Sequence, residues 1–153
     1  MAAYYLDTSA LAKRYVTEQG SEWVETLITT AESDLDTGRL TAVQIVAALA
    51  RKARTGGTTP AEAIRGIQDF RYDWPRDYLI LEVTPGVTER AMDLAQAHGL
   101  RGYDAVHLGA ALDLHEARRE AGLPTLVFVS ADDDQCQAAL AEGLPVEDPN
   151  AHP

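Results

Sequence analysis

Residues 125–130 read TLVFVS, a run dominated by β-branched and apolar side chains. A run of this kind, without alternating polar residues, is typical of a strand buried on both faces of a parallel sheet. Residues 3–6 (AYYL) and 79–83 (LILEV) have the same character, and residues 144–147 favour a short edge strand. Together these segments predict a central parallel sheet of four to five strands.

Helical patterns separate the predicted strands, and several begin at Asp, Thr, Ser or Pro, as is typical of helix N-termini. Helices are expected at about residues 7–16, 21–30, 40–54, 60–72, 84–98, 102–119 and 132–142, and the polar stretch 33–38 is expected to be a connection. This alternation is typical of a three-layer α/β/α sandwich, the fold class that we predict. One domain is expected over residues 1–147, followed by a frayed tail over 148–153.

The composition excludes several classes of protein. With 153 residues, of which 46% are hydrophobic, the chain is too apolar for a disordered polymer and has the length of one ordinary domain. No apolar run reaches the roughly 18 residues of a membrane helix, and the first residues lack the pattern of a signal peptide. The single cysteine, Cys136, excludes an internal disulfide framework and a cysteine-built zinc site. We therefore expect a cytoplasmic protein with no membrane partner.

The charge balance is strongly acidic, with 13 Lys and Arg against 24 Asp and Glu, a net charge of −11. This balance disfavours a general nucleic-acid binder, which needs a basic face. The surplus acid can be solvated surface, a complement to a basic partner, or a set of ligands for cations. The positions of the carboxylates have to decide among these explanations.

Three aspartates lie where the predicted architecture forms its binding crevice. Asp7 follows the first strand, Asp132 lies two residues beyond the strand 125–130, and Asp104 is in the first turn of the helix 102–119. The carboxyl ends of parallel strands face helix N-termini at one edge of the sheet. Each aspartate alone can be a helix cap, but Asp104 lies on a mainly apolar helix face, where a carboxylate needs a cation or hydrogen bonds. We expect the three to converge within metal-bridging distance.

Three segments resemble, in order, the motifs of PIN-domain nucleases: YYLDTSAL at 4–11, YDAVHL at 103–108 and FVSAD at 128–132. The size and spacing are most similar to the VapC-type toxins of bacterial toxin–antitoxin pairs. This resemblance implies a PIN-like fold and a toxin that is a metal-dependent endoribonuclease. It also implies an RNA substrate, a small antitoxin partner that covers the acidic groove, and a homodimer.

The resemblance also implies roles for individual residues. Asp7, Asp104 and Asp132 would coordinate Mg²⁺ or Mn²⁺ through oxygen, the ligand that these hard cations prefer. The metal would activate a water molecule that attacks the phosphorus. Ser9 and Ser130 would hold the carboxylates or the water, although both could equally be simple helix caps.

Position 44 departs from the family pattern. The family has an acidic residue, typically Glu, in the helix that corresponds to 40–54, and the matching residue here is Gln44. Gln is nearly isosteric with Glu but removes one negative charge, so we expect weakened metal binding and slow RNA cleavage. Arg51 and Lys52, further along the same helix, could contact RNA phosphates or form a solvated basic face.

Two other functions remain open. One is a non-catalytic PIN-like module that binds a partner, which Gln44 favours. The other is a receiver-like phospho-acceptor domain, which is disfavoured because Asp7 has no adjacent acid and no Lys follows the late strand. For the homodimer implied by the resemblance, Trp23, Val24 and Ile28 are candidates for an exposed apolar face.

Overall fold

The computed structural model describes residues 2–30 and 32–153. Within this part of the chain, five parallel strands form one sheet in the order β3-β2-β1-β4-β5. The strands are β1 (Ala3–Leu6), β2 (Asp34–Gly38), β3 (Leu79–Leu81), β4 (Leu126–Val129) and β5 (Val146–Glu147). The first strand of the chain is therefore the centre of the sheet, as a doubly wound α/β/α fold requires.

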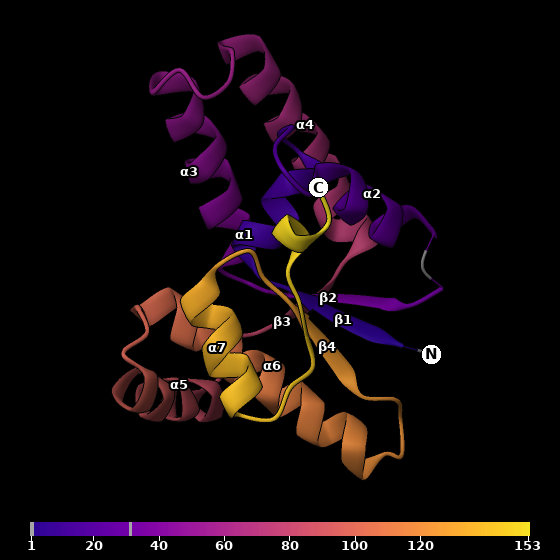
Figure 1. Cartoon of the computed structure of the whole chain (residues 1–153), viewed down its shortest axis with the longest axis vertical. Coiled ribbons are helices and arrows are strands. Elements are labelled where there is room, and N and C mark those ends of the chain that lie inside the picture. The colour runs from indigo at the N-terminus through magenta and orange to yellow at the C-terminus, as the bar shows by residue number, and fades with distance from the viewer. Residues whose placement is uncertain (1, 31) are drawn as a thin grey trace.

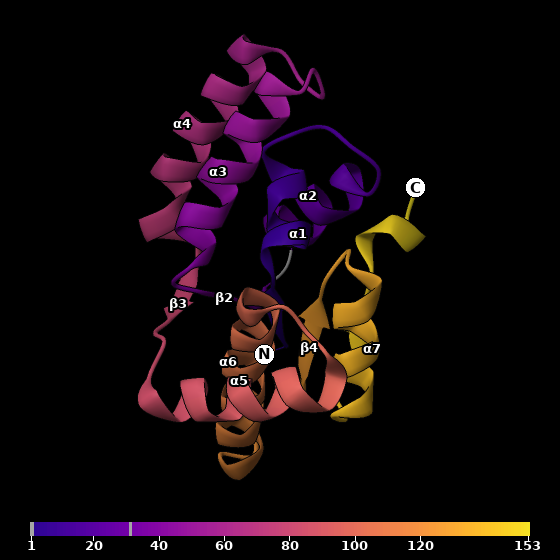
Figure 2. The same ribbon diagram turned by 90° about the vertical axis from the view of Figure 1, so that its left-hand side faces the viewer.

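Helices cover both faces of this sheet (Figures 1 and 2). The first four α-helices pack against one face, and α5, α6 and α7 pack against the other. Their bounds are α1 (Thr8–Leu11), α2 (Ser21–Thr30), α3 (Thr41–Arg54), α4 (Pro60–Asp77), α5 (Pro85–His98), α6 (Gly102–Glu120) and α7 (Asp133–Ala141), with 3-10 helices η1 (Ala12–Arg14) and η2 (Pro149–Ala151). The predicted three-layer α/β/α sandwich is confirmed.

Successive residues of the central strands enter two different cores, because side chains of a strand alternate between its faces. Tyr5 of β1 and Phe128 of β4 lie on the α5–α7 side, where their rings stack with centroids 5.6 Å apart. Leu6 and Val129 lie on the other side, among the side chains of α1 to α4. The apolar runs that predicted these strands thus supply both cores at once.

The prediction that residues 33–38 form a connection is wrong, because Asp34–Gly38 forms strand β2 beside β1. Asp36 is buried within it, and Thr37 Oγ1 donates a hydrogen bond to the carbonyl of Leu6 at 2.7 Å. Burial, together with the charge of Asp34, raises the pKa of Asp36 to about 6. The sequence DLDTG has no apolar run, so its strand conformation comes from its neighbours in the sheet.

The end of the chain is ordered rather than frayed. Pro149 is buried, and η2 lies against α2, where the rings of His152 and Trp23 stack with centroids 4.6 Å apart. Val24 and Ile28 are also buried, at 0% and 8% exposure. The expected frayed tail is therefore not found, and the apolar face of α2 expected at a dimer interface is packed inside the molecule.

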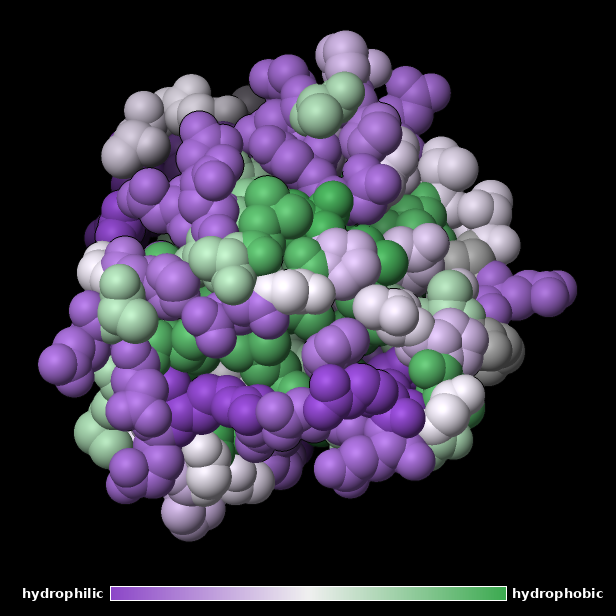
Figure 3. Space-filling model, turned by 60° about the horizontal axis from the view of Figure 1, so that its bottom comes forward, coloured by the Kyte–Doolittle hydropathy of each residue, from purple (hydrophilic) through white to green (hydrophobic). Residues whose placement is uncertain are grey.

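The outer surface is mostly hydrophilic. With the lower part of Figure 1 turned toward the viewer, hydrophilic residues surround a central band of apolar ones (Figure 3). Within the described residues, no helix is long and apolar enough to cross a membrane.

The buried carboxylate of Asp36 predicts a pH-dependent stability. Its pKa of about 6 in the folded protein lies above the ordinary value near 3.9. Between these pH values the folded state binds more protons, so the contribution of Asp36 to stability falls as pH rises. An Asp36→Asn variant should therefore gain stability relative to the parent from about pH 4 to about pH 6, by about 1–3 kcal/mol in all, and keep that gain at higher pH.

Urea unfolding at a series of pH values measures this difference. The exposed Asp93→Asn makes the same chemical change outside the core and is the control. A difference between Asp36→Asn and the parent that does not vary with pH would contradict the raised pKa.

Candidate active site

Asp7 lies at the carboxyl end of the central strand and is only 3% exposed. Its carboxylate is the N-cap of α1, accepting hydrogen bonds at Oδ1 from Ser9 Oγ at 2.6 Å and from the Ala10 backbone N–H at 3.0 Å. At Oδ2 it accepts a hydrogen bond from Ser130 Oγ at 2.6 Å. Ser9 and Ser130 therefore both hold Asp7, as the sequence predicted for one of their two possible roles.

The environment of Asp7 favours its neutral form. Burial raises the pKa of Asp7 to about 6, against the lowering effect of the hydrogen bonds from Ser130 and Ser9, and the charge of Asp104 adds to the rise. Asp7 is therefore protonated at a higher pH than an ordinary aspartate.

Asp104 is influenced by its surroundings in a similar way, and it lies near the segment of Asp132. Asp104 is half-buried in the first turn of α6, and its pKa is raised by burial and then by the charge of Asp132. Asp132 is the N-cap of α7, where its Oδ1 accepts a hydrogen bond from the Gln135 backbone N–H at 3.0 Å. The side-chain amide of Gln135, fully buried, donates to the Asp104 carbonyl at 2.9 Å. Gln135, which the sequence analysis did not identify, thus ties the two acidic segments together.

The three aspartates do not form a finished metal site. Across residues 2–30 and 32–153, no group of three His, Cys, Asp or Glu side chains is placed to hold a metal ion. The expected convergence within metal-bridging distance is therefore not met in this arrangement. Two of the three carboxylates accept hydrogen bonds instead: that of Asp7 from hydroxyls, and that of Asp132 from the N-terminus of α7.

Gln44, in the first turn of α3, is joined to this region by a partly buried chain of hydrogen bonds. Its side-chain oxygen accepts a hydrogen bond from Thr8 Oγ1 at 2.6 Å and lies 2.8 Å from His107 Nε2. The other ring nitrogen of His107 lies 2.8 Å from the hydroxyl of Tyr5. Gln44 therefore lies beside Thr8, the residue that follows Asp7 in the sequence.

His107 is held neutral in this chain, because burial lowers its pKa to about 4. Residue 38 is glycine beside the Tyr5 hydroxyl that contacts this ring: a Cβ there would lie 2.8 Å from that oxygen, which is too close, and 3.5 Å from His107 Nδ1, which is an ordinary contact. No role was predicted for His107 from the sequence. The available signal was its position three residues after Asp104, which places both on one face of α6.

The two predicted RNA contacts have different surroundings. Arg51 is exposed on α3. Lys52 is half-buried and forms an ion pair with Glu18, which also pairs with the buried Lys13 at 3.1 Å. These lysines lie beside the aspartate region, in a cavity that also includes Thr8 and Ser9.

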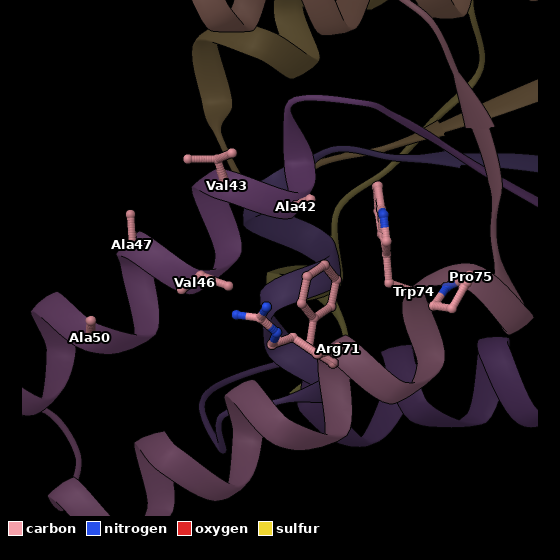
Figure 4. Close-up of a pocket in the computed structure, with 9 residues that line it drawn as sticks. Ala42, Val43, Val46, Ala47, Ala50, Arg71, Trp74 and Pro75 are labelled. Atoms are coloured by element: carbon pink, nitrogen blue, oxygen red, sulfur yellow. The ribbon is translucent and has the colours of Figure 1, made fainter.

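An apolar groove of about 630 Å³ separates α3 and α4 (Figure 4). Val46 on α3 and the side chains of Arg71 and Trp74 on α4 point into the space between the two helices. Val43, one residue before Gln44, also lines the groove and is 71% exposed. The groove and the acidic region thus share helix α3.

The family follows from the comparison with known proteins. Residues 4–141 match the PIN domain, and the chain belongs to the PIN-domain family. Two ribonucleases of Mycobacterium tuberculosis, VapC45 and VapC49, are each 38% identical to it over 112 residues, which is 73% of this chain and 76% of theirs. The resemblance noted in the sequence is therefore confirmed.

Solved structures show the same fold at lower identity. PAE2754 from Pyrobaculum aerophilum superposes with a TM-score of 0.64 at 22% identity, over 99% of this chain and 86% of that chain. A VapBC2 structure from Rickettsia felis, bound to a promoter DNA fragment, gives 0.62 at 10% identity over 95% and 98% of the two chains. VapC20 of M. tuberculosis, a sarcin–ricin loop cleaving toxin, gives 0.59 at 16% identity over 92% and 95%.

The hydrogen bonds around His107 predict its tautomer. If its Nδ1 accepts from the Tyr5 hydroxyl and its Nε2–H donates to the oxygen of Gln44, every group in the chain is satisfied. Long-range ¹H–¹⁵N NMR should then show the proton on Nε2, with the signal assigned by its loss in a His107→Asn variant. A proton on Nδ1 would contradict this arrangement and place the amide nitrogen of Gln44, instead of its oxygen, toward His107.

Proposed function

We propose that this protein is a VapC-type toxin, a metal-dependent endoribonuclease of a toxin–antitoxin pair. The observation that carries the proposal is the placement of three acidic segments at one end of the parallel sheet. Ser9 and Ser130 hold Asp7 there, and Gln135, in the helix that Asp132 caps, donates a hydrogen bond to the carbonyl of Asp104. Three segments that are distant in sequence bring negative charge to the region where α/β folds bind ligands. The membership in the PIN-domain family and the similarity to two VapC ribonucleases support the same activity.

The donor set supports a hard divalent cation. Asp7, Asp104 and Asp132 would hold Mg²⁺ or Mn²⁺, and they offer only oxygen, the ligand that both ions prefer. Burial is the main cause that raises the pKa of Asp7 and of Asp104, and the charge of Arg101 only partly offsets the rise at Asp104, so a bound cation would favour the ionised form of both carboxyls. When bound, such an ion polarises the phosphate and lowers the pKa of a water molecule.

The chain's own residues orient this acidic region. The hydroxyls of Ser9 and Ser130 fix the two oxygens of Asp7 from opposite ends of the chain. Gln135 of α7 donates a hydrogen bond to the backbone carbonyl of Asp104. This bond holds the start of α6, with Asp104, next to the start of α7, with Asp132. Pre-positioning of this kind reduces the reorganisation needed when a charged substrate arrives.

The contacts of Gln44 support an attenuated activity. Its oxygen is already engaged by Thr8 and His107, and the other side-chain atom that it offers is an amide nitrogen, which cannot ligate a cation. A glutamate at position 44 would keep both hydrogen bonds on one carboxylate oxygen and offer the second to the metal. We propose that Gln44 leaves the site one ligand and one charge short, with weak metal binding and slow cleavage.

The test of this proposal is a Gln44→Glu variant. It should raise Mn²⁺ affinity and RNA cleavage by at least about 10- to 100-fold, judging from the effect of changes around metal ligands. Asp104→Asn should abolish the remaining cleavage. The measurement pairs isothermal titration with Mn²⁺ and cleavage of a labelled RNA, and Gln96→Glu on the exposed side of α5 is the control with the same change of charge.

The outcomes separate the two candidate functions. If Gln44→Glu behaves like Gln96→Glu, position 44 lies outside the metal site. If neither the parent nor Gln44→Glu cleaves RNA or binds Mn²⁺, the protein is the non-catalytic PIN-like module that the occupied oxygen of Gln44 also permits.

We also propose an antitoxin partner. Several solved structures with the same fold are toxin–antitoxin complexes, including one from Klebsiella pneumoniae with a TM-score of 0.60 at 17% identity, over 97% of this chain and 98% of that chain. Because Val43 of the apolar groove and Gln44 of the acidic region are adjacent on α3, one segment can cover both. Such a segment would place apolar side chains in the groove and a basic side chain against the aspartates.

A charged residue introduced into the apolar groove tests whether the antitoxin binds there. Val43→Asp should weaken binding of the antitoxin encoded beside this chain by at least 10-fold, because the exposed valine would become a carboxylate against apolar side chains. Ile64→Asp, on an exposed position of α4 outside the groove, is the control. Sedimentation of both variants gives the affinity and also tests the predicted homodimer. Equal binding by the two variants would contradict the groove as the contact.

A further inference from the structure

A second cavity, of about 350 Å³, opens beside the acidic region. Thr8 and Ser9, which contact Gln44 and Asp7, form one side of it. Lys13 and Lys52 line the same cavity, and Asn150 of the ordered C-terminal segment lies on its rim. We name this cavity the lysine pocket. It is continuous with the proposed site because both share Thr8 and Ser9.

The lysine pocket holds two cations and one anion. Glu18 receives a hydrogen bond from Lys13 at one carboxylate oxygen, at 3.1 Å, and from Lys52 at the other. Burial opposes the charge on Glu18, but the hydrogen bonds from Lys52 and Lys13 outweigh it and lower its pKa, so Glu18 is ionised. The three charges sum to +1 in a chain whose net charge is −11.

The two lysines differ in how far their side chains are exposed to solvent. Lys13 is 5% exposed and fixed in the wall, whereas Lys52 is 31% exposed and accessible to a ligand. Lys52 follows Gln44 by two helical turns on α3, about 12 Å along the helix axis, on the same side as Ala48 of the pocket wall. A chain of phosphodiesters that passes Gln44 can therefore reach Lys52 without leaving this face.

We propose that the lysine pocket binds a backbone phosphate of the RNA substrate, adjacent to the phosphate at the aspartates, and that Glu18 competes with it for the lysines. The proposal rests on the proposed function. An RNA strand approaching an acidic site is repelled, and an ammonium group next to that site offsets part of this repulsion. Lysine binds phosphate as a point charge, which needs no sequence-specific geometry.

The experiment measures RNA binding without cleavage. A fluorescent single-stranded RNA is titrated with the whole protein in EDTA buffer, at several salt concentrations, and followed by anisotropy. Lys52→Gln should weaken binding by 3- to 10-fold and reduce the slope of log K against log salt by about 0.7, the value for one phosphate contact on a single strand. Arg54→Gln makes the same charge change on the same helix outside the pocket and should retain the parent slope.

Replacing the competing carboxylate of Glu18 gives a second test, in which RNA binding should become tighter instead of weaker. Glu18→Gln frees both lysines and should tighten RNA binding, whereas Glu22→Gln, an equal charge change on the exposed side of α2, should have the smaller effect of net charge alone. Circular dichroism melts confirm that each variant is folded.

Three outcomes would contradict the proposal that the lysine pocket binds a phosphate. They are no measurable RNA binding by the parent, equal effects of Lys52→Gln and Arg54→Gln, or weaker binding by Glu18→Gln. Cleavage in Mn²⁺ separates this failure from that of the proposed function. If the protein cleaves RNA but Lys52→Gln and Arg54→Gln have equal effects, the proposed function stands and the phosphate site in the lysine pocket is wrong. A protein that never cleaves, yet binds RNA through Lys52, loses the nuclease assignment alone.

Discussion

The buried carboxylate of Asp7 is the constraint on which the rest of the site depends. It ends the central strand, caps α1 through Ala10, and accepts a hydrogen bond from Ser130 at the end of the neighbouring strand. A charged group at this depth is stable only with donors on every side or in its neutral form. The same contacts therefore join three elements of the fold and leave a carboxylate with a raised pKa at the sheet edge.

Helix α3 contributes to three different surfaces near this carboxylate. Val43 and Val46 line the apolar groove, Gln44 meets Thr8 and His107, and Lys52 lines the lysine pocket. The 3.6-residue period makes this division possible, because residues four apart share a face and adjacent residues do not. A ligand that touches one of these surfaces is close to the other two.

The apolar strands and capped helices could be predicted from the sequence because their patterns are local. The strand 125–130 and the Asp7 that follows the first strand are examples. Strand β2 could not, since DLDTG resembles a turn and becomes a strand only through pairing with β1 and β3. The tail was missed for a similar reason: the stacking of His152 on Trp23 joins residues far apart in the sequence.

The sequence by itself determined the fold class, the family and the aspartates that end strands or begin helices, because each is a property of a short segment and its spacing. The tertiary structure alone decided how those residues are used. Ser130 holds Asp7, Gln44 gives its oxygen to Thr8 and His107, and Lys52 pairs with Glu18. Hydrogen bonds and ion pairs between distant segments depend on distances that no local pattern contains, and they set the charge that the site presents.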